Sequence, residues 1–173
     1  SLMSIEFDSL IDRVERLAAE YEMKYHGCSQ CVVAAIQEGL GLSNKSAFKA
    51  ATGLAGGVAR MGETCGALLG GIISIGIIFG RDMLEDSTTS IGYQKTMQLS
   101  SQLCNEFINE FGTTRCRDIQ MKLFGRSFNL NDPEQRREFV LAGAYNINGC
   151  PSVVRKAARI ATKIIIENLK TRK

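Results

Sequence analysis

The chain has 173 residues, of which 45% are hydrophobic and 23% are charged, and its formal net charge is +3. This length predicts one domain with a sizeable core, and this composition excludes a disordered chain. The small charge and the lack of a basic cluster with interleaved aromatic residues argue against a nucleic-acid-binding surface. We therefore expect a single helical domain over residues 3–173, with Ser1 and Leu2 as an expression remnant.

The first part of the chain has the spacing of apolar residues that is typical of helices. One apolar stripe covers residues 5–25 and predicts a first helix, which Gly27 ends. A second helix is expected over residues 28–40, where a pair of glycines stops it. Ser43 is the predicted N-cap of a short third helix. The glycine-rich residues 53–59 predict a loop or a close approach of two backbones.

Residues 64–80 carry no charge and predict a helix at the centre of the fold. The run is shorter than the roughly 20 residues that a membrane span needs, so we expect no membrane span. A small membrane-associated protein is the alternative that this run supports. Small residues recur at every fourth position, namely at Gly62, Gly66, Gly70 and Ser74. One face of the helix is therefore flat and lets another helix approach closely, within the chain or in a homodimer.

The second half of the chain continues the helical pattern. Residues 81–90 are a polar loop, and a helix is expected from about residue 90 to 111. A shorter helix follows the Thr113-Thr114 cap. Asp132-Pro133 predicts the start of a helix that runs to about Tyr145, and a final helix opens at Cys150-Pro151. No segment alternates like a strand, so the predicted fold class is all-α, a compact bundle of seven or eight helices around the glycine-rich helix.

Four of the six cysteines lie at predicted helix N-termini, and these are Cys28, Cys65, Cys116 and Cys150. The positive end of a helix favours a thiolate, which is the reactive and metal-binding form of cysteine. The segment after Met3 is acidic and amphipathic rather than a signal peptide, so we expect a cytoplasmic chain. Thiols stay reduced in that compartment unless they are catalytic or bound to metal. The four positions therefore predict a redox or metal site.

The two other cysteines and the one histidine are weaker candidates for the site. Cys28 and Cys31 form a C-x-x-C pair, but Cys31 is expected to face the core, and Cys104 is expected to pack in the middle of a helix. His26, the one histidine, is expected at the surface end of a helix rather than as a ligand. Single cysteines at distant positions suit an iron–sulfur cluster or a thiol–disulfide relay better than a zinc site, which needs close ligand pairs.

At these residues the chain resembles a family of redox-active proteins that is named after its four-cysteine pattern, C_GCAxxG_C_C. The central motif is the stretch from Gly62 to Gly70 around Cys65, and Cys28, Cys116 and Cys150 take the other cysteine positions. The resemblance covers about residues 10–165. It implies a bacterial or archaeal protein linked to redox chemistry, by electron transfer or by thiol chemistry, with a redox partner that the sequence does not identify.

Two functions follow as hypotheses. In the first, the four cysteines are redox thiols or the ligands of an iron–sulfur cluster or another thiolate-bound metal. Gly66 and Gly70 then give room for the cofactor site, and Arg60 and Glu63 tune Cys65, because a cation favours a thiolate and an anion opposes it. A solvated ion pair is the alternative role for Arg60 and Glu63. In the second hypothesis, the chain is a structural or partner-binding helical module whose cysteines only pack.

Overall fold

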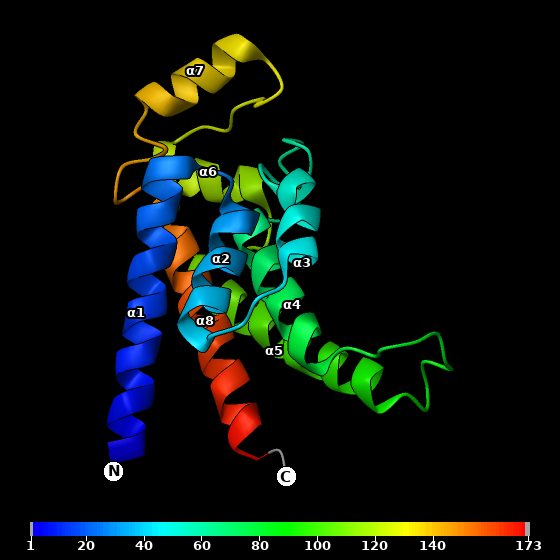
Figure 1. The fold of residues 1–173 in the computed structure, drawn as a ribbon. Helices are drawn as coiled ribbons and strands as arrows, with labels where there is room; N and C mark the ends of the chain where they lie inside the picture. The colour runs from blue at the N-terminus through cyan, green and yellow to red at the C-terminus, as the bar shows by residue number, and fades with distance from the viewer. Residues whose placement is uncertain (1, 172–173) are drawn as a thin grey trace.

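The computed structural model describes residues 2–171, and these residues form an all-α fold, as predicted (Figure 1). Residue 1 of the expected remnant and residues 172–173 of the C-terminal tail lie outside the described residues. The elements are α1 (Leu2–Tyr25), α2 (Cys28–Leu40), α3 (Lys45–Ala50), the 3-10 turn η1 (Thr52–Leu54), α4 (Gly66–Phe79), α5 (Ile91–Phe111), α6 (Cys116–Phe124), α7 (Pro133–Leu141) and α8 (Cys150–Lys170). Between residues 2 and 171 the one β-type contact is an isolated bridge that joins Thr64 to Arg115.

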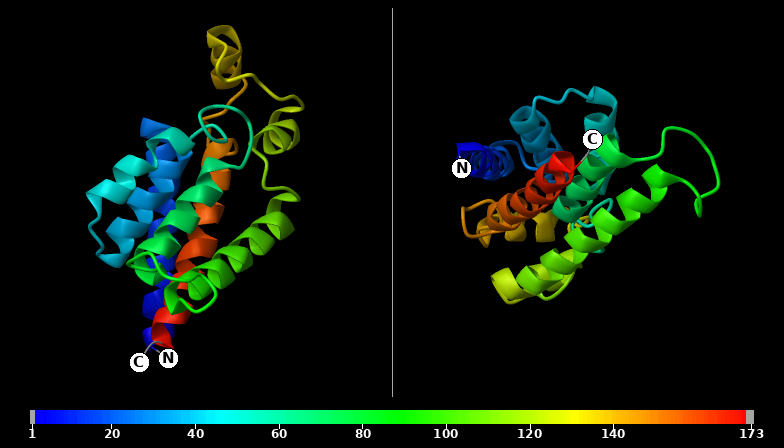
Figure 2. Two further views of the ribbon diagram at one scale, coloured as in Figure 1. Left: turned by 90° about the vertical axis from the view of Figure 1, so that its right-hand side faces the viewer. Right: turned by 90° about the horizontal axis from the view of Figure 1, so that it is seen from below.

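The uncharged helix α4 lies inside the bundle, where it packs against α2, α5 and α8 (Figure 2). A Cβ atom added at Gly70 would lie 2.5 Å from the carbonyl oxygen of Ser29 on α2. A Cβ added at Gly71 would lie 2.8 Å from Leu103 on α5. The flat face of α4 is therefore covered by helices of the same chain rather than left free for a homodimer.

The core is apolar and continuous around α4, and its largest buried side chains include Leu68, Ile75, Leu99, Leu103, Phe107, Ile164 and Ile165. Cys31 and Cys104 belong to this core or pack against it, as predicted. Helix α1 packs on α2 and α8, and Arg159 of α8 pairs with Asp12 and Glu15 of α1. Within residues 2–171, no helix is both long enough and apolar enough to cross a membrane.

Residues 125–149, which we call the arm, contain α7 and stand over one end of the bundle (Figure 1). The arm has its own small cluster of buried side chains, made of Phe128, Leu130, Phe139 and Ala144. Its helix ends at Leu141, four residues before the predicted end at Tyr145, because Gly143 turns the backbone with a φ of 96°. The chain then makes a tight turn that leads into α8, with a hydrogen bond from the Cys150 N–H to the Ala144 carbonyl.

Other helix boundaries also differ from the predictions, and the N-cap of α6 is Arg115 rather than a residue of the predicted Thr113-Thr114 cap. The N-cap of α3 is Asn44 rather than Ser43, because the Asn44 side chain accepts a hydrogen bond from the N–H of Ala47. Helix α4 begins at Gly66 rather than at residue 64, because the backbone of Thr64 is extended in its bridge to Arg115. The start of α4 bears on the site, because it leaves Cys65 as the N-cap of the central helix.

Candidate functional site

A cavity of about 620 Å³ lies between the arm and the end of the bundle, and the four predicted cysteines all line it. Each of them stands at the start of a different helix. Cys28, Cys116 and Cys150 are the first residues of α2, α6 and α8, and Cys65 is the N-cap of α4. Cys150 lies one position further into its helix than predicted, because Gly149 is the N-cap of α8. Four helix N-termini thus meet at one cavity.

The isolated bridge sets the positions of Cys65 and Cys116. The N–H of Cys65 donates to the Thr114 carbonyl at 2.8 Å, and the N–H of Cys116 donates to the Glu63 carbonyl at 2.6 Å. The two cysteines are therefore diagonal neighbours on one face of a short antiparallel pair, with Cα atoms roughly 7–8 Å apart in such geometry. That separation is just beyond the usual range for a disulfide, so a small backbone movement would join them.

Glycines give the cysteines the space that they occupy. A Cβ added at Gly66 would lie 2.5 Å from the sulfur of Cys28 and 2.9 Å from the carbonyl oxygen of Leu54. A Cβ added at Gly57 would lie 2.7 Å from the Cβ of Cys116. Gly66 therefore belongs to the site by making room for a thiol. Gly70 lies one turn further along, outside the cavity lining, where it contacts α2.

The loop before Cys65 has an unusual backbone. Five successive residues have positive φ angles, and three of them carry side chains, namely Val58 at 64°, Ala59 at 50° and Arg60 at 64°. A left-handed conformation costs roughly 1–2 kcal/mol for each such residue. Hydrogen bonds hold the loop, including one of 2.8 Å from the Ala59 N–H to the Gly53 carbonyl. Strain of this kind is typical of functional sites, and here it brings Arg60 to the cavity.

Burial keeps the four thiols neutral. It raises the pKa of Cys65 to about 12, although the N–H groups of Ala67 and Leu68 lower this pKa in part. It also raises the pKa values of Cys28 and Cys150 well above the ordinary value for a thiol. The prediction that the helix N-termini favour thiolates is therefore wrong for these thiols as they stand, because the cost of burying a charge exceeds the benefit of the helix ends.

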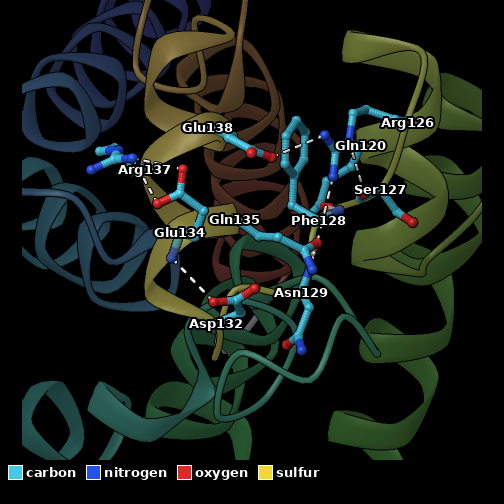
Figure 3. A network of polar contacts seen from close by, with 10 residues as sticks. All are labelled: Gln120, Arg126, Ser127, Phe128, Asn129, Asp132, Glu134, Gln135, Arg137 and Glu138. Carbon is cyan, nitrogen blue, oxygen red and sulfur yellow. Dashed lines mark hydrogen bonds and ion pairs between the residues drawn. The ribbon is translucent and has the colours of Figure 1, made fainter.

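Of the four cysteines, Cys116 has the surroundings that favour a thiolate most. Burial raises the pKa of its thiol, whereas the amide of Gln120 and the guanidinium of Arg117 lower it in part. The Nε2 group of Gln120 donates to the Cys116 sulfur at 3.4 Å, and its Oε1 atom accepts from the N–H of Phe128 in the arm at 2.8 Å. Gln120 is 2% exposed, so this buried amide links the thiol to the arm. Figure 3 shows Gln120 next to Phe128 of the arm.

Polar contacts hold the arm in the shape that covers the cavity (Figure 3). Arg126 pairs with Glu138, and the Oε1 atom of Gln135 accepts from the N–H of Asn129. The arm also contacts the end of α1, where the ring of Tyr145 stacks on the ring of His26 with centroids 3.5 Å apart. His26 is exposed at the end of α1, as predicted, and its stacked ring closes the cavity wall next to the arm.

Sequence reasoning missed Glu22, a carboxylate that lines the cavity and is 2% exposed. Desolvation raises its pKa to about 7, and a hydrogen bond with Cys31 lowers this pKa in part. Its Oε2 atom has no hydrogen-bond partner. The signal was present in the sequence, because Glu22 lies four residues after Ala18 in the apolar stripe of the first helix. Gln120 could have been found in the same way, four residues after Cys116.

The charged residues predicted beside Cys65 are separated in the structure. Arg60 lines the cavity, together with Arg136 and Arg137 of the arm. Glu63 lies outside the lining and is exposed. Its carboxylate pairs with Arg115 and Arg117 at 3.4 and 3.3 Å, so it makes a solvated ion pair with partners other than Arg60.

The described cysteines form neither a metal site nor a disulfide in this arrangement. Among residues 2–171, no group of three or more His, Cys, Asp or Glu side chains lies close enough to hold a metal ion. All six cysteines in this part of the chain are free thiols. The four sulfurs as placed do not fit a metal ion, and what they share is one cavity.

Comparison with known proteins agrees with the pattern of the cysteines. Residues 26–164 match the model of the family described as "Putative redox-active protein (C_GCAxxG_C_C)". No curated protein and no solved structure matches the chain significantly.

Proposed function

The chain belongs to the C_GCAxxG_C_C family of redox-active proteins, and we propose that its redox centre is the set of four cysteines around the cavity. The four cysteines come from distant parts of the sequence and line the same cavity. They are Cys28, Cys65, Cys116 and Cys150. This convergence is the observation that carries the proposal, because cysteines that only pack have no reason to gather at the starts of four helices. The strained loop and the buried carboxylate at the same place support it.

Thiol–disulfide exchange is the chemistry that these residues support best. Cys116 is the attacking thiol in this scheme, since Gln120 and Arg117 lower its pKa in part. Its thiolate attacks one sulfur of an external disulfide and releases the other half as a thiol. Cys65, its diagonal neighbour, then attacks the mixed disulfide and releases the second half. In total, the two cysteines lose two electrons and two protons, and the external disulfide becomes two thiols.

Cys28 and Cys150 complete the centre as a second dithiol. The charge of Glu22 raises the pKa of both thiols, and ionisation of Cys150 would further raise that of Cys28. These couplings support a position for both thiols near Glu22, and both are also coupled to Cys65. Exchange of this dithiol with a Cys65–Cys116 disulfide moves two electrons across the cavity, with one disulfide broken for each disulfide formed.

The experiment that tests the proposal counts thiols before and after the reduced protein meets a small neutral disulfide, bis(2-hydroxyethyl) disulfide. With one equivalent of this disulfide we expect two fewer thiols and one internal disulfide in the peptide map, between Cys65 and Cys116 or, after internal exchange, between Cys28 and Cys150. Cys65→Ser should leave Cys116 as a mixed disulfide instead. Cys104→Ser is the matched control, because Cys104 is a residue of α5 that packs against the core and does not line the cavity. This variant should lose the same number of thiols as the unmodified protein.

The two alternatives predict different results in the same preparation. An iron–sulfur cluster or other thiolate-bound metal predicts iron or zinc, with labile sulfide for a cluster, after anaerobic purification. A module whose cysteines only pack predicts no metal and no loss of thiols after exposure to the disulfide. Either result would rule out the exchange chemistry proposed above.

A further inference from the structure

The lining of the cavity includes a buried carboxylate, Glu22, and one of its two oxygens has no hydrogen-bond partner. Glu22 is 2% exposed, and its Oε2 atom lacks a hydrogen-bond partner. An unpaired carboxylate in such a place is costly to the fold, since a buried charge needs a partner. Of the lining residues, Glu22 alone is acidic. The groups that face it from other elements are the thiols of Cys28, Cys31, Cys65 and Cys150 and the phenol of Tyr145.

The rim of the cavity carries the opposite charge. Arg60 and Arg137 are exposed there, and Arg136 is half-buried. Arg137 pairs with Glu134, and Arg136 donates to the Leu130 carbonyl. Arg60 has no ion-pair partner within the described chain, since the nearby Glu63 pairs with Arg115 and Arg117. The lining of the cavity therefore includes a cation without an ion-pair partner, Arg60, and a buried carboxylate with one unsatisfied oxygen, Glu22.

We propose that the cavity binds a small thiol or disulfide of the amino-acid type, with its ammonium group at Glu22 and its carboxylate at Arg60. The inference deepens the proposed function and rests on it for the reaction, but not for the binding. A volume of about 620 Å³ lies within the range of small-molecule sites. Such a ligand gives each of these two charged groups a partner of opposite sign, and its side-chain sulfur lies in a cavity that is lined by four thiols.

The reaction of this ligand follows the exchange already described. A disulfide of this class accepts two electrons from two cavity cysteines, and one cavity disulfide forms as two ligand thiols leave. Two protons pass from the cysteines to the two ligand thiols, so atoms and charges balance. The ionised carboxylate of Glu22 binds the ammonium group, and desolvation raises the pKa of Glu22 to about 7. Binding should therefore strengthen as the pH rises through this value, as long as the amine stays protonated.

Binding can be measured without any redox step. S-methylcysteine has the ammonium and carboxylate groups but cannot exchange, and its affinity for the reduced protein can be measured by calorimetry. Glu22→Gln keeps the shape of the side chain and should weaken binding by about tenfold or more, as expected for the loss of a buried charge-assisted hydrogen bond. Arg60→Asn should weaken binding less, because Arg60 is exposed, and asparagine tolerates the left-handed backbone. Glu20→Gln, an exposed carboxylate on the same helix, is the matched control and should change nothing.

A panel of disulfides then separates the two charged contacts. The rates of oxidation of the reduced protein by cystine, cystamine, 3,3′-dithiodipropionate and bis(2-hydroxyethyl) disulfide are each divided by the rate with free dithiothreitol. We expect cystine to be fastest. Glu22→Gln should remove the advantage of the two disulfides with amines, cystine and cystamine. It should leave the neutral disulfide as fast or faster, since loss of the Glu22 charge lowers the pKa values of the thiols.

The outcomes distinguish this inference from the proposed function. Equal relative rates for the four disulfides, or equal slowing of all four in Glu22→Gln, would overturn the inference while the exchange chemistry stands. If no disulfide oxidises the protein, the exchange chemistry fails, and the calorimetry with S-methylcysteine still decides the binding. Absence of S-methylcysteine binding to the unmodified protein, or the same affinity in Glu22→Gln, would overturn the inference in that case as well.

Discussion

The middle of α4 and its N-terminal end use glycine for different purposes. In the middle, Gly70 and Gly71 let α2 and α5 pack closely, and the hydroxyl of Ser74 donates to the Gly70 carbonyl. At the end, Gly66 makes room for the sulfur of Cys28, and the loop before it holds residues in left-handed backbone. Along the middle, the glycines serve packing between helices. At the end, they serve four thiols around a cavity.

The difference indicates where the fold gains stability and where it gives stability up. Close helix packing stabilises the middle of the bundle, since the buried apolar contacts there are continuous. The cavity end carries a buried carboxylate with one unsatisfied oxygen, buried thiols and left-handed residues, all of which cost free energy. Substitutions in the middle should therefore destabilise the fold, whereas some substitutions at the cavity end should stabilise it.

The largest effect is expected from Gly70→Val. The new side chain would meet the Ser29 carbonyl at a distance that no Cβ contact adopts, so α2 must move away from α4. We expect a loss of about 3 kcal/mol or more in the free energy of unfolding, as for severe overpacking of a core. Gly76→Ala is the control, because nothing lies within 4 Å of the new Cβ. That variant should be unchanged or more stable in urea unfolding; equal effects of the two substitutions would contradict the packing argument.

Glu22→Gln should act in the opposite direction and depend on pH. Desolvation raises the pKa of Glu22 from its ordinary 4.5 to about 7 in the folded chain. A raised carboxyl pKa means that the folded state binds the proton more tightly, so its stability falls as the pH rises from about 4.5 to about 7. Near pH 8 the neutral glutamine should therefore be more stable than the carboxylate by about 3 kcal/mol. At pH 4 the two should be similar, and a pH-independent difference in urea unfolding would contradict this account.

The sequence predicts the helices of both regions but only part of the site. Apolar periodicity, the Asp132-Pro133 start and the helix-start cysteines involve neighbouring residues, and these predictions are confirmed. The surroundings of Glu22 come from α1, α2, α8 and the arm together, so no local pattern reveals that one of its oxygens is buried without a hydrogen-bond partner. For Gln120, the spacing predicts its contact with the thiol one turn earlier on α6, but its contact with a backbone group of the arm depends on the tertiary fold.

The prediction that the four cysteines are thiolates was wrong for a related reason. A helix start can be recognised from sequence, and its charge preference follows from the orientation of its N–H groups. The depth of burial cannot be recognised in this way, because the arm that covers the thiols begins nine residues after Cys116 and ends next to Cys150. Since desolvation is the first cause of the raised pKa of every cavity cysteine, the tertiary arrangement decides their ionisation.

Gly66→Ala should show that the glycine at the cavity end serves a thiol. The new methyl group would meet the sulfur of Cys28 and the carbonyl of Leu54, so we expect a cost of about 1–3 kcal/mol in urea unfolding. Removal of the sulfur in the double variant Gly66→Ala with Cys28→Ala should restore part of this stability. If the double-mutant cycle shows no coupling, Gly66 is needed for the Leu54 backbone alone, and its role toward the thiol is rejected.

The smallest change in stability is expected for alanine-to-glycine substitutions, which we compare at two positions. Ala59→Gly, in the left-handed loop, should stabilise the fold by about 1 kcal/mol, because glycine adopts a positive φ without the steric cost that alanine has. Ala34→Gly, within α2, should destabilise it by about the same amount, since glycine is a poor helix former. Opposite signs for the same chemical change would locate the strain at the cavity end. If Ala59→Gly also destabilises the fold, the loop is held by contacts that exceed its backbone cost, and the cavity end is then as well supported as the middle of α4.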